Sequence, residues 1–138
     1  MSFGRGSPTA QENVDVVRRL IAGLNAHDLE GYLMCCHEDV ELHLPVVAGV
    51  YEGREGIRRW FADIEDAGPA FHADLQRVEA VGDDHVLAFF HVTSTGRASG
   101  APVTMETANA YDLIDGKISR IRIFVDPRAA REAVGLGE

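Results

Sequence analysis

Hydrophobic residues in the first half of the chain mostly recur every three or four positions, which is the period of an amphipathic helix. Three helices are predicted on this basis. The first follows the capping-box pattern of Thr9 and Glu12, the second follows Asp28 as its N-cap, and the third stops before Gly68 and Pro69. The single apolar face of each helix is made by Val17, Leu20, Ile21 and Leu24, then by Leu29, Tyr32, Leu33 and Cys36, and finally by Ile57, Trp60, Phe61 and Ile64.

Apolar and polar residues alternate in the rest of the chain, which is the period of a half-buried strand. The apolar face changes side between Leu75 and Val78, which predicts a β-bulge, and Asp115-Gly116 is a strong hairpin signal. The expected strands are residues 40–44, 71–81, 85–95, 102–114 and 117–125, with a glycine-rich loop at 45–56 and a short helix at 128–134. We therefore expect an α+β domain with three N-terminal helices packed on a curved, mostly antiparallel sheet, and a pocket between them.

Length and charge narrow the class of protein. A chain of 138 residues is the size of one domain, which we place at residues 12–135, between a loose N-terminus at 1–11 and a tail at 136–138. The net charge of −9 argues against a nucleic-acid partner, because phosphate binding needs a basic surface. No apolar run approaches the ~20 residues of a membrane span, so no membrane partner is expected.

The cysteines indicate a reducing compartment. Cys35 and Cys36 are the only two, and they are adjacent inside the predicted second helix, where a disulfide between them would be strained. The first twelve residues lack the apolar core of a signal peptide. We therefore expect a cytoplasmic protein with free thiols.

Several local motifs, in this order of elements, resemble one known family. They are Asn25-Ala26-His27-Asp28-Leu29 between the first two helices, Tyr51-Glu52-Gly53-Arg54-Glu55-Gly56-Ile57 before the third, and the hairpin Asp115-Gly116-Lys117-Ile118. With them the chain resembles the SnoaL-like family of the nuclear transport factor 2-like superfamily, which also contains ketosteroid isomerase. The resemblance implies a cone-shaped fold and a homodimer formed through the outer face of the sheet. It does not specify the function, because the fold hosts isomerases, cyclases, epoxide hydrolases, dehydratases and proteins without catalytic activity.

Most catalytic residues of ketosteroid isomerase have no counterpart here. The resemblance places its oxyanion-hole tyrosine at Leu20, its general-base aspartate at Leu44 and its second oxyanion-hole acid at Asn109. Enolisation needs a base to accept the proton and a donor to hold the enolate. Since only Asn109 can donate, isomerase activity of that kind is not expected, and no catalytic residue is assigned.

The same register predicts an apolar cavity with a few polar groups. Such a cavity suits a small apolar ligand with a carbonyl or anionic end. Two interpretations of the last strand stay open: the resemblance turns Arg120 and Arg122 inward, whereas the apolar face of Ser119, Ile121, Ile123 and Val125 turns them to water. The expected ligand-binding residues are Leu20, Leu44, Trp60, Phe90, Thr107, Asn109, Tyr111, Arg122 and Phe124.

The remaining candidate chemistry is weak. No HxH or HxxxH pair occurs among the six histidines, so neither a metal nor a cofactor is expected, and His43 and His91 are predicted outside the cavity face. The leading hypothesis is a binder of a small apolar molecule. The alternatives are a divergent isomerase, cyclase, dehydratase or hydrolase of secondary metabolism, or an interaction module without catalysis.

Overall fold

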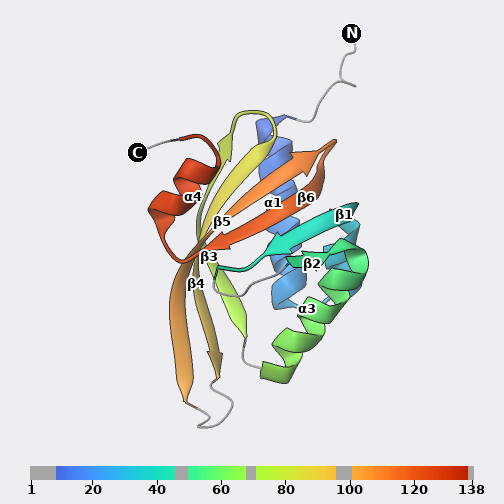
Figure 1. The fold of residues 1–138 in the computed structure, drawn as a ribbon, viewed down its shortest axis with the longest axis vertical. Helices are drawn as coiled ribbons and strands as arrows, with labels where there is room; N and C mark the ends of the chain where they lie inside the picture. Colours follow the sequence, from blue (N-terminus) through green and yellow to red (C-terminus); the bar gives the residue numbers. More distant parts are fainter. Residues whose placement is uncertain (1–8, 46–49, 68–70, 96–100, 137–138) are drawn as a thin grey trace.

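The computed structural model describes residues 9–45, 50–67, 71–95 and 101–136 of the chain, which form an α+β fold (Figure 1). The sheet has six strands in the order β2-β1-β6-β5-β4-β3, and β1–β6 is its parallel pair. The elements are α1 (Ala10–Asn25), α2 (Leu29–Met34), β1 (Cys36–His43), β2 (Val50–Glu52), α3 (Gly53–Ala67), β3 (His72–Val81), β4 (His85–Thr95), β5 (Pro102–Ile114), β6 (Lys117–Phe124) and α4 (Pro127–Ala133).

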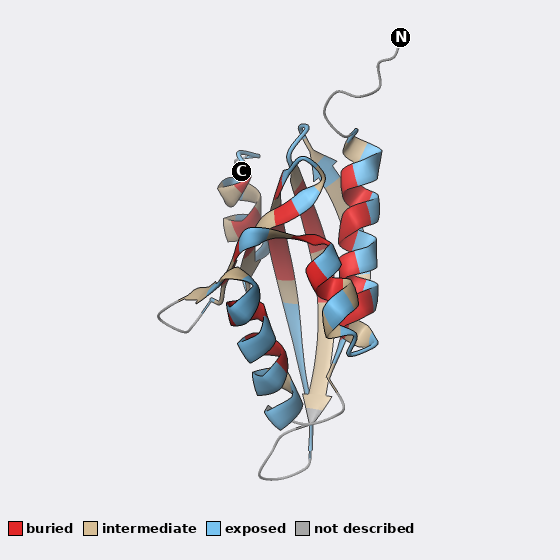
Figure 2. Ribbon diagram, turned by 90° about the vertical axis from the view of Figure 1, so that its right-hand side faces the viewer, coloured by how far each residue is buried: buried red, intermediate tan, exposed pale blue. Residues whose placement is uncertain are grey.

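The helices lie on both faces of the sheet. α1 packs mainly on β3, and α3 packs on β1 and β2, so that these two helices and α2 cover what we call the inner face. α4 lies on the opposite, outer face against β4, β5 and β6 (Figure 1). The buried positions of α1 and α3 face the sheet while their other sides are exposed (Figure 2), as the helical period predicts. None of the described helices is long and apolar enough to cross a membrane.

Strand register decides which side chains reach the inner face. Asn109 of β5 lies beside Ala88 of β4 and Ile123 of β6, so these three share a face. Ala110 lies beside Arg122, and this pair faces the outer side. Asn109, Ala88 and Ile123 therefore lie on the inner face of the sheet.

Two bulges interrupt this alternation. The β3–β4 register shifts between Leu75 and Arg77, which confirms the bulge that the change of apolar face predicts. A second shift lies between Asp112 and Leu113, opposite the part of β6 where Ser119 has no paired residue. Because a bulge adds one residue to one strand, the side chains beyond it change face relative to simple alternation.

The first helix begins as predicted, whereas the cysteines lie elsewhere than predicted. α1 begins at Ala10, and the capping box of Thr9 and Glu12 is confirmed, while residues 1–8 lie outside the described part of the chain. α2 ends at Met34. Cys35 is its C-cap and Cys36 begins β1, so the expectation that both cysteines lie within the helix is wrong.

The predicted loop at 45–56 contains regular structure. Its residues 46–49 are outside the described part, but Val50–Glu52 form the edge strand β2, and α3 starts at Gly53. Three residues are too few for alternation to reveal a strand. Gly53 has φ +70°, a conformation that glycine adopts without strain, and this allows the chain to turn from β2 directly into α3.

Candidate ligand pocket

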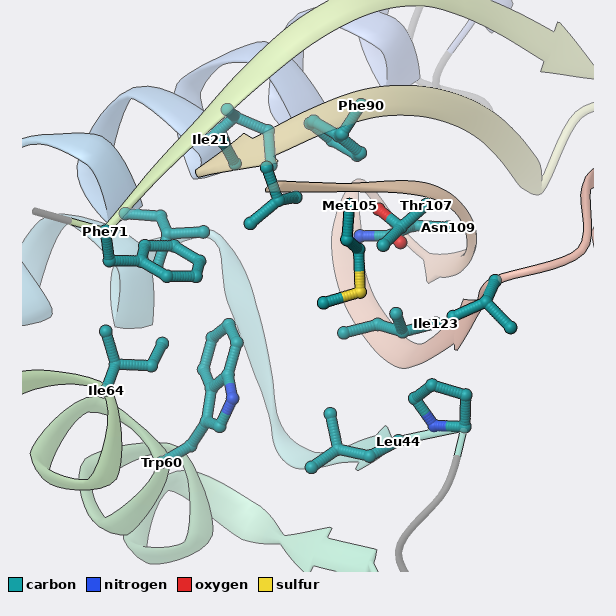
Figure 3. A pocket seen from close by; sticks show the side chains of 15 residues that line it. Ile21, Leu44, Trp60, Ile64, Phe71, Phe90, Met105, Thr107, Asn109 and Ile123 are labelled. Carbon is teal, nitrogen blue, oxygen red and sulfur yellow. The ribbon is translucent and has the colours of Figure 1, made fainter. Parts of the chain in front are cut away.

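A pocket of about 300 Å³ lies between the inner face of the sheet, α1 and α3 (Figure 3). The residues that line it come from α1, from α3, from the chain directly after β1, and from strands β3 to β6 with their flanking residues. Its lining is Ile21, Leu24, Leu44, Pro45, Trp60, Ile64, Phe71, Ala73, Phe90, Val92, Met105, Thr107, Asn109, Ile123 and Val125.

The lining is almost wholly apolar. Thr107 and Asn109 contribute a hydroxyl and an amide, and they lie next to one another on β5 at one side of the pocket (Figure 3). Trp60 lies across the pocket from them on α3. None of the described lining residues carries an ionisable side chain. General acid–base catalysis by a lining residue therefore has no candidate group.

Asn109 is the central polar group of the pocket. Its side-chain Nδ2 donates a hydrogen bond to the hydroxyl of Tyr111 at 3.1 Å, while its Oδ1 is buried without a hydrogen-bond partner among the described residues. Only 9% of Asn109 is exposed. A buried amide oxygen without a hydrogen-bond donor lowers stability by about 1–3 kcal/mol. The Oδ1 of Asn109 is such an acceptor in an otherwise apolar wall.

Tyr111 supports Asn109 from behind. It is 1% exposed, and burial raises the pKa of its hydroxyl, so it stays protonated. A hydroxyl both donates and accepts, and a terminal amide presents similar shapes in its two orientations. The Asn109–Tyr111 pair can therefore offer the pocket either the amide oxygen or the amide N–H.

Five of the predicted ligand-binding residues line the pocket: Leu44, Trp60, Phe90, Thr107 and Asn109. Their position is that expected from the sequence, and binding itself stays a prediction.

Leu20 and Tyr111 do not line the pocket. Leu20 is fully buried in the main hydrophobic core together with Tyr111. Both positions face inward, as predicted, but they lie at the part of the sheet where helix and strands close onto each other. They support the pocket without reaching it.

Arg122 and Phe124 are on the wrong face for the predicted role. Arg122 donates to Asp112 on the outer face at 2.9 Å, and Phe124 packs against the small cluster beneath α4. Ile123 and Val125 line the pocket in their place, so alternation was the better guide than the resemblance. Phe124 is partly buried on the outer face because it packs against the cluster that includes Ala130 of α4. Both faces of this strand are therefore partly apolar.

Sequence reasoning also missed lining residues outside the last strand. Ile21, Leu24 and Ile64 are on the predicted apolar helix faces, but the helical period does not distinguish core from pocket wall. Met105 also lines the pocket, and alternation along β5 places it on the same face as Thr107 and Asn109.

Charged groups gather on the outer face instead. The carboxylate of Asp112 accepts from Arg120 at 2.7 and 2.9 Å, from Arg122 at 2.9 Å and lies 3.0 Å from His85 Nδ1. Burial acts to raise the pKa of Asp112, but the hydrogen bond from Arg120 and the charges of Arg120, Arg122 and His85 together lower it. An Asp-Arg pair thus exists, on the side of the sheet opposite the pocket.

Other candidate groups carry no chemistry in the pocket. His43 contacts Glu41 and His91 contacts Glu106, both on the outer face. In the described ranges no three His, Cys, Asp or Glu side chains are arranged to hold a metal ion. Burial raises the pKa of Cys36 to about 12, so its thiol is a poor nucleophile near neutral pH.

The fold and pocket define an α+β cone with one apolar chamber, and comparison with known proteins identifies its family. The sequence model of the family described as SnoaL-like domain matches residues 17–121, which is most of the chain. The chain belongs to this family, and its fold is that of the nuclear transport factor 2-like proteins.

Solved structures agree with this assignment. Bal32a, from a soil-derived mobile gene cassette, is 26% identical, with a TM-score of 0.76 over 89% of this chain and 96% of that one. TerC, co-crystallised with polyporic acid, is 23% identical, with a TM-score of 0.75 over 89% and 98% of the two chains. SalBIII is described as an epoxide hydrolase/cyclase-like enzyme in pyran ring formation in the polyether salinomycin; it is 20% identical, with a TM-score of 0.76 over 84% and 92%. The last two show a shared fold alone.

Proposed function

We propose that this protein binds a molecule whose largely apolar body carries one neutral polar group, a carbonyl or a hydroxyl, which hydrogen-bonds to Asn109 in the pocket. The observation that carries the proposal is the unpaired amide oxygen of Asn109 in an otherwise apolar pocket. Small-molecule sites typically combine apolar walls with a few polar groups that fix orientation. Asn109 and its neighbour Thr107 are those polar groups here.

The pocket volume suggests the size of the ligand. Ligand pockets typically measure roughly 300–1,000 Å³, and this one, at about 300 Å³, is at the lower end. A cavity of about 150 Å³ is known to accept benzene. A compact molecule of about two fused or linked rings is therefore the size class that we propose.

The pocket favours a neutral group over a charged one. The predicted anionic end depended on Arg122, which lies on the outer face. An anion among these apolar walls would lack a compensating cation and would lose its hydration, at a high cost in free energy. A carbonyl suits the amide N–H of Asn109, and a hydroxyl suits its oxygen.

Catalysis is a second candidate function, favoured by the Asn109–Tyr111 pair. Tyr111 holds its proton, because burial raises its pKa, and the pair can strengthen a hydrogen bond to an oxygen that gains negative charge during a reaction. SalBIII is described as cyclase-like. Such a reaction would have to take its base from the substrate or water, because the described lining offers none.

A homodimer through the outer face remains part of the proposal. α4 already covers the centre of that face through Ala130 and Val134, so a partner would contact the strands beyond it, near Phe89 and His91. Sedimentation equilibrium over a micromolar range tests this. A monomer throughout would overturn the homodimer and leave the pocket proposal unaffected.

The binding proposal can be tested with the protein's own fluorescence. Trp60 is the only tryptophan and lines the pocket, so its emission should change when a ligand enters. We expect 2-acetylnaphthalene or 2-naphthol to titrate this signal. Losing one neutral hydrogen bond should weaken binding of both in Asn109→Leu by about fivefold, while Arg120→Gln, on the outer face, serves as a matched control.

Two results would overturn the proposal. One is the absence of any saturable change of Trp60 emission across a panel of neutral ring compounds. The other is equal affinity in the wild type and in Asn109→Leu, which would show that the amide does not contact the ligand. Consumption of a bound compound, followed by mass spectrometry, would favour the catalytic candidate.

A further inference from the structure

The inner pocket lies next to another hollow where the β1–β6 ladder ends. The last paired residues of this ladder are His43 and Arg122. Beyond them a second hollow of about 390 Å³ lies on the outer face, and its lining includes these two residues. The side chains that line both this outer hollow and the inner pocket are Leu44, Pro45, Ile123 and Val125.

These four shared residues form a thin partition. Leu44 and Ile123 lie together at one end of the inner pocket (Figure 3), and neither is fully buried. Val125 is 53% exposed, whereas Leu42 and Ile121, a little further along the ladder, are 0% and 1% exposed. Leu42 and Ile121 are therefore fully buried, whereas the side chains between the two hollows are partly exposed. A flexible chain that runs from one hollow to the other would pass these partly exposed side chains.

The outer hollow carries the cation that the inner pocket lacks. The guanidinium of Arg122 donates through one terminal nitrogen to Asp112, and its Nε is buried with no hydrogen-bond partner among the described residues. Asp112 is shared with Arg120, so two guanidinium groups face one carboxylate. This leaves positive charge and an unmet donor at Arg122, which an anionic acceptor would satisfy.

The acidic groups near the hollow are already engaged. Asp126 lines it, but its Oδ1 accepts from the backbone N–H of Arg128 at 3.0 Å as the N-cap of α4. Glu41 contacts His43 Nε2 at 3.0 Å. Both contacts reduce the repulsion that these carboxylates exert on an incoming carboxylate.

We propose that the natural ligand class is an amphipathic acid, with an apolar ring body in the inner pocket and a flexible chain that carries its carboxylate past Leu44 and Val125 to Arg122. This inference rests on the proposed function, since it adds a second anchoring point to a ligand already held at Asn109. It places the anionic end of the ligand on the outer side of the sheet. The acid thereby avoids the apolar chamber, where its charge would be unpaired.

A matched pair of probes tests this inference. The probes are 2-naphthyl ketones bearing a polymethylene chain of short, intermediate or long length that ends in a carboxylate, and the methyl ester of each. Binding is followed by Trp60 fluorescence, and the measured quantity is the affinity ratio of acid to ester. For the chain length that spans the partition, we expect the acid to bind the wild type about tenfold more tightly than its ester, as a charge-assisted hydrogen bond to Arg122 implies.

Arg122→Gln should abolish this ratio while leaving ester affinity within about twofold of the wild type. Arg120→Gln is the control, because it removes another guanidinium from Asp112 but does not line the outer hollow. It should keep the ratio, which distinguishes contact with the carboxylate from a general change in charge. Circular dichroism of both variants establishes that they are folded.

The outcomes separate the two proposals. Ester binding that depends on Asn109, with no advantage for the acid at any chain length, overturns this inference and leaves the proposed function standing. An advantage that persists in Arg122→Gln also overturns it, since the carboxylate would then bind elsewhere. If neither acid nor ester binds, the proposed function fails and the inference fails with it.

Discussion

Removal of both partners of the buried Asn109–Tyr111 hydrogen bond should make the protein more stable. In the wild type, Asn109 is 9% exposed, and its Oδ1 has no hydrogen-bond partner within the described part of the chain. An unpaired buried group of this kind costs about 1–3 kcal/mol, whereas the neutral hydrogen bond to Tyr111 contributes only about 1 kcal/mol. The double variant Asn109→Leu, Tyr111→Phe loses the bond but also the unpaired atom, so we expect a net gain of about 1 kcal/mol.

The single variants should behave differently from the pair. Tyr111→Phe leaves the whole amide unpaired, so we expect a loss of about 1–2 kcal/mol. Asn109→Leu removes the unpaired oxygen but leaves the Tyr111 hydroxyl without its partner, and these effects should nearly cancel. The two substitutions are therefore expected to be non-additive, as contacting residues usually are.

The measurement is a double-mutant cycle by urea unfolding at equilibrium, with circular dichroism as the probe. A double variant that is less stable than the wild type, or single effects that simply add, would refute the reasoning. The first result would mean that the polar atoms of Asn109 are already satisfied in the folded protein, and the second would mean that Asn109 and Tyr111 are not energetically coupled. A gain in stability together with lost ligand binding would indicate that this residue is retained for function.

Three further predictions concern the rest of the molecule. Gly56→Ala should destabilise the protein by about 1–3 kcal/mol in urea unfolding, because an added Cβ would lie 2.7 Å from the backbone carbonyl carbon of Tyr51. A gain in stability of about 1 kcal/mol, which is usual when alanine replaces a glycine inside a helix, would contradict this prediction. The pKa of Asp112 is lowered in the folded protein. The ionised Asp112 carboxylate therefore contributes fully to the free energy of unfolding above its ordinary pKa of 3.8, and this contribution should be lost as pH falls through the lower folded-state pKa. Asp112→Asn should flatten the acid limb of stability against pH, and an unchanged limb would be contrary evidence. Cys35 and Cys36 are buried, and their pKa values are raised. Iodoacetamide should therefore alkylate both thiols slowly in the native protein and rapidly in urea, as measured by mass spectrometry. Equal rates in the two conditions would show that the thiols are accessible in the folded protein.

Periodicity and the family resemblance together predict most of the helices and strands and the apolar character of the pocket. The helical period of the first half and the alternation of the second predict three helices followed by antiparallel strands, because burial of an apolar face fixes the local period in each case. Leu44, Trp60, Phe90, Thr107 and Asn109 line the pocket as the combined pattern and resemblance predict. These residues are on strongly one-sided elements, where one face has no alternative to burial.

Local patterns do not fix the final position of every side chain, because they do not show what covers each face of the sheet. Alternation along the last strand places Arg122 on the outer face and the family register places it on the inner face. The outer face is correct, because Arg122 pairs there with Asp112, and Phe124 is packed there against the cluster that includes α4. The unpaired position at Ser119 also changes the face of the residues that follow it relative to simple alternation. Leu20 is equally apolar whether it meets the core or the pocket, and only the closeness of the facing strands buries it. Where a side chain finally points therefore depends on what covers each face, and that is a property of the folded chain as a whole.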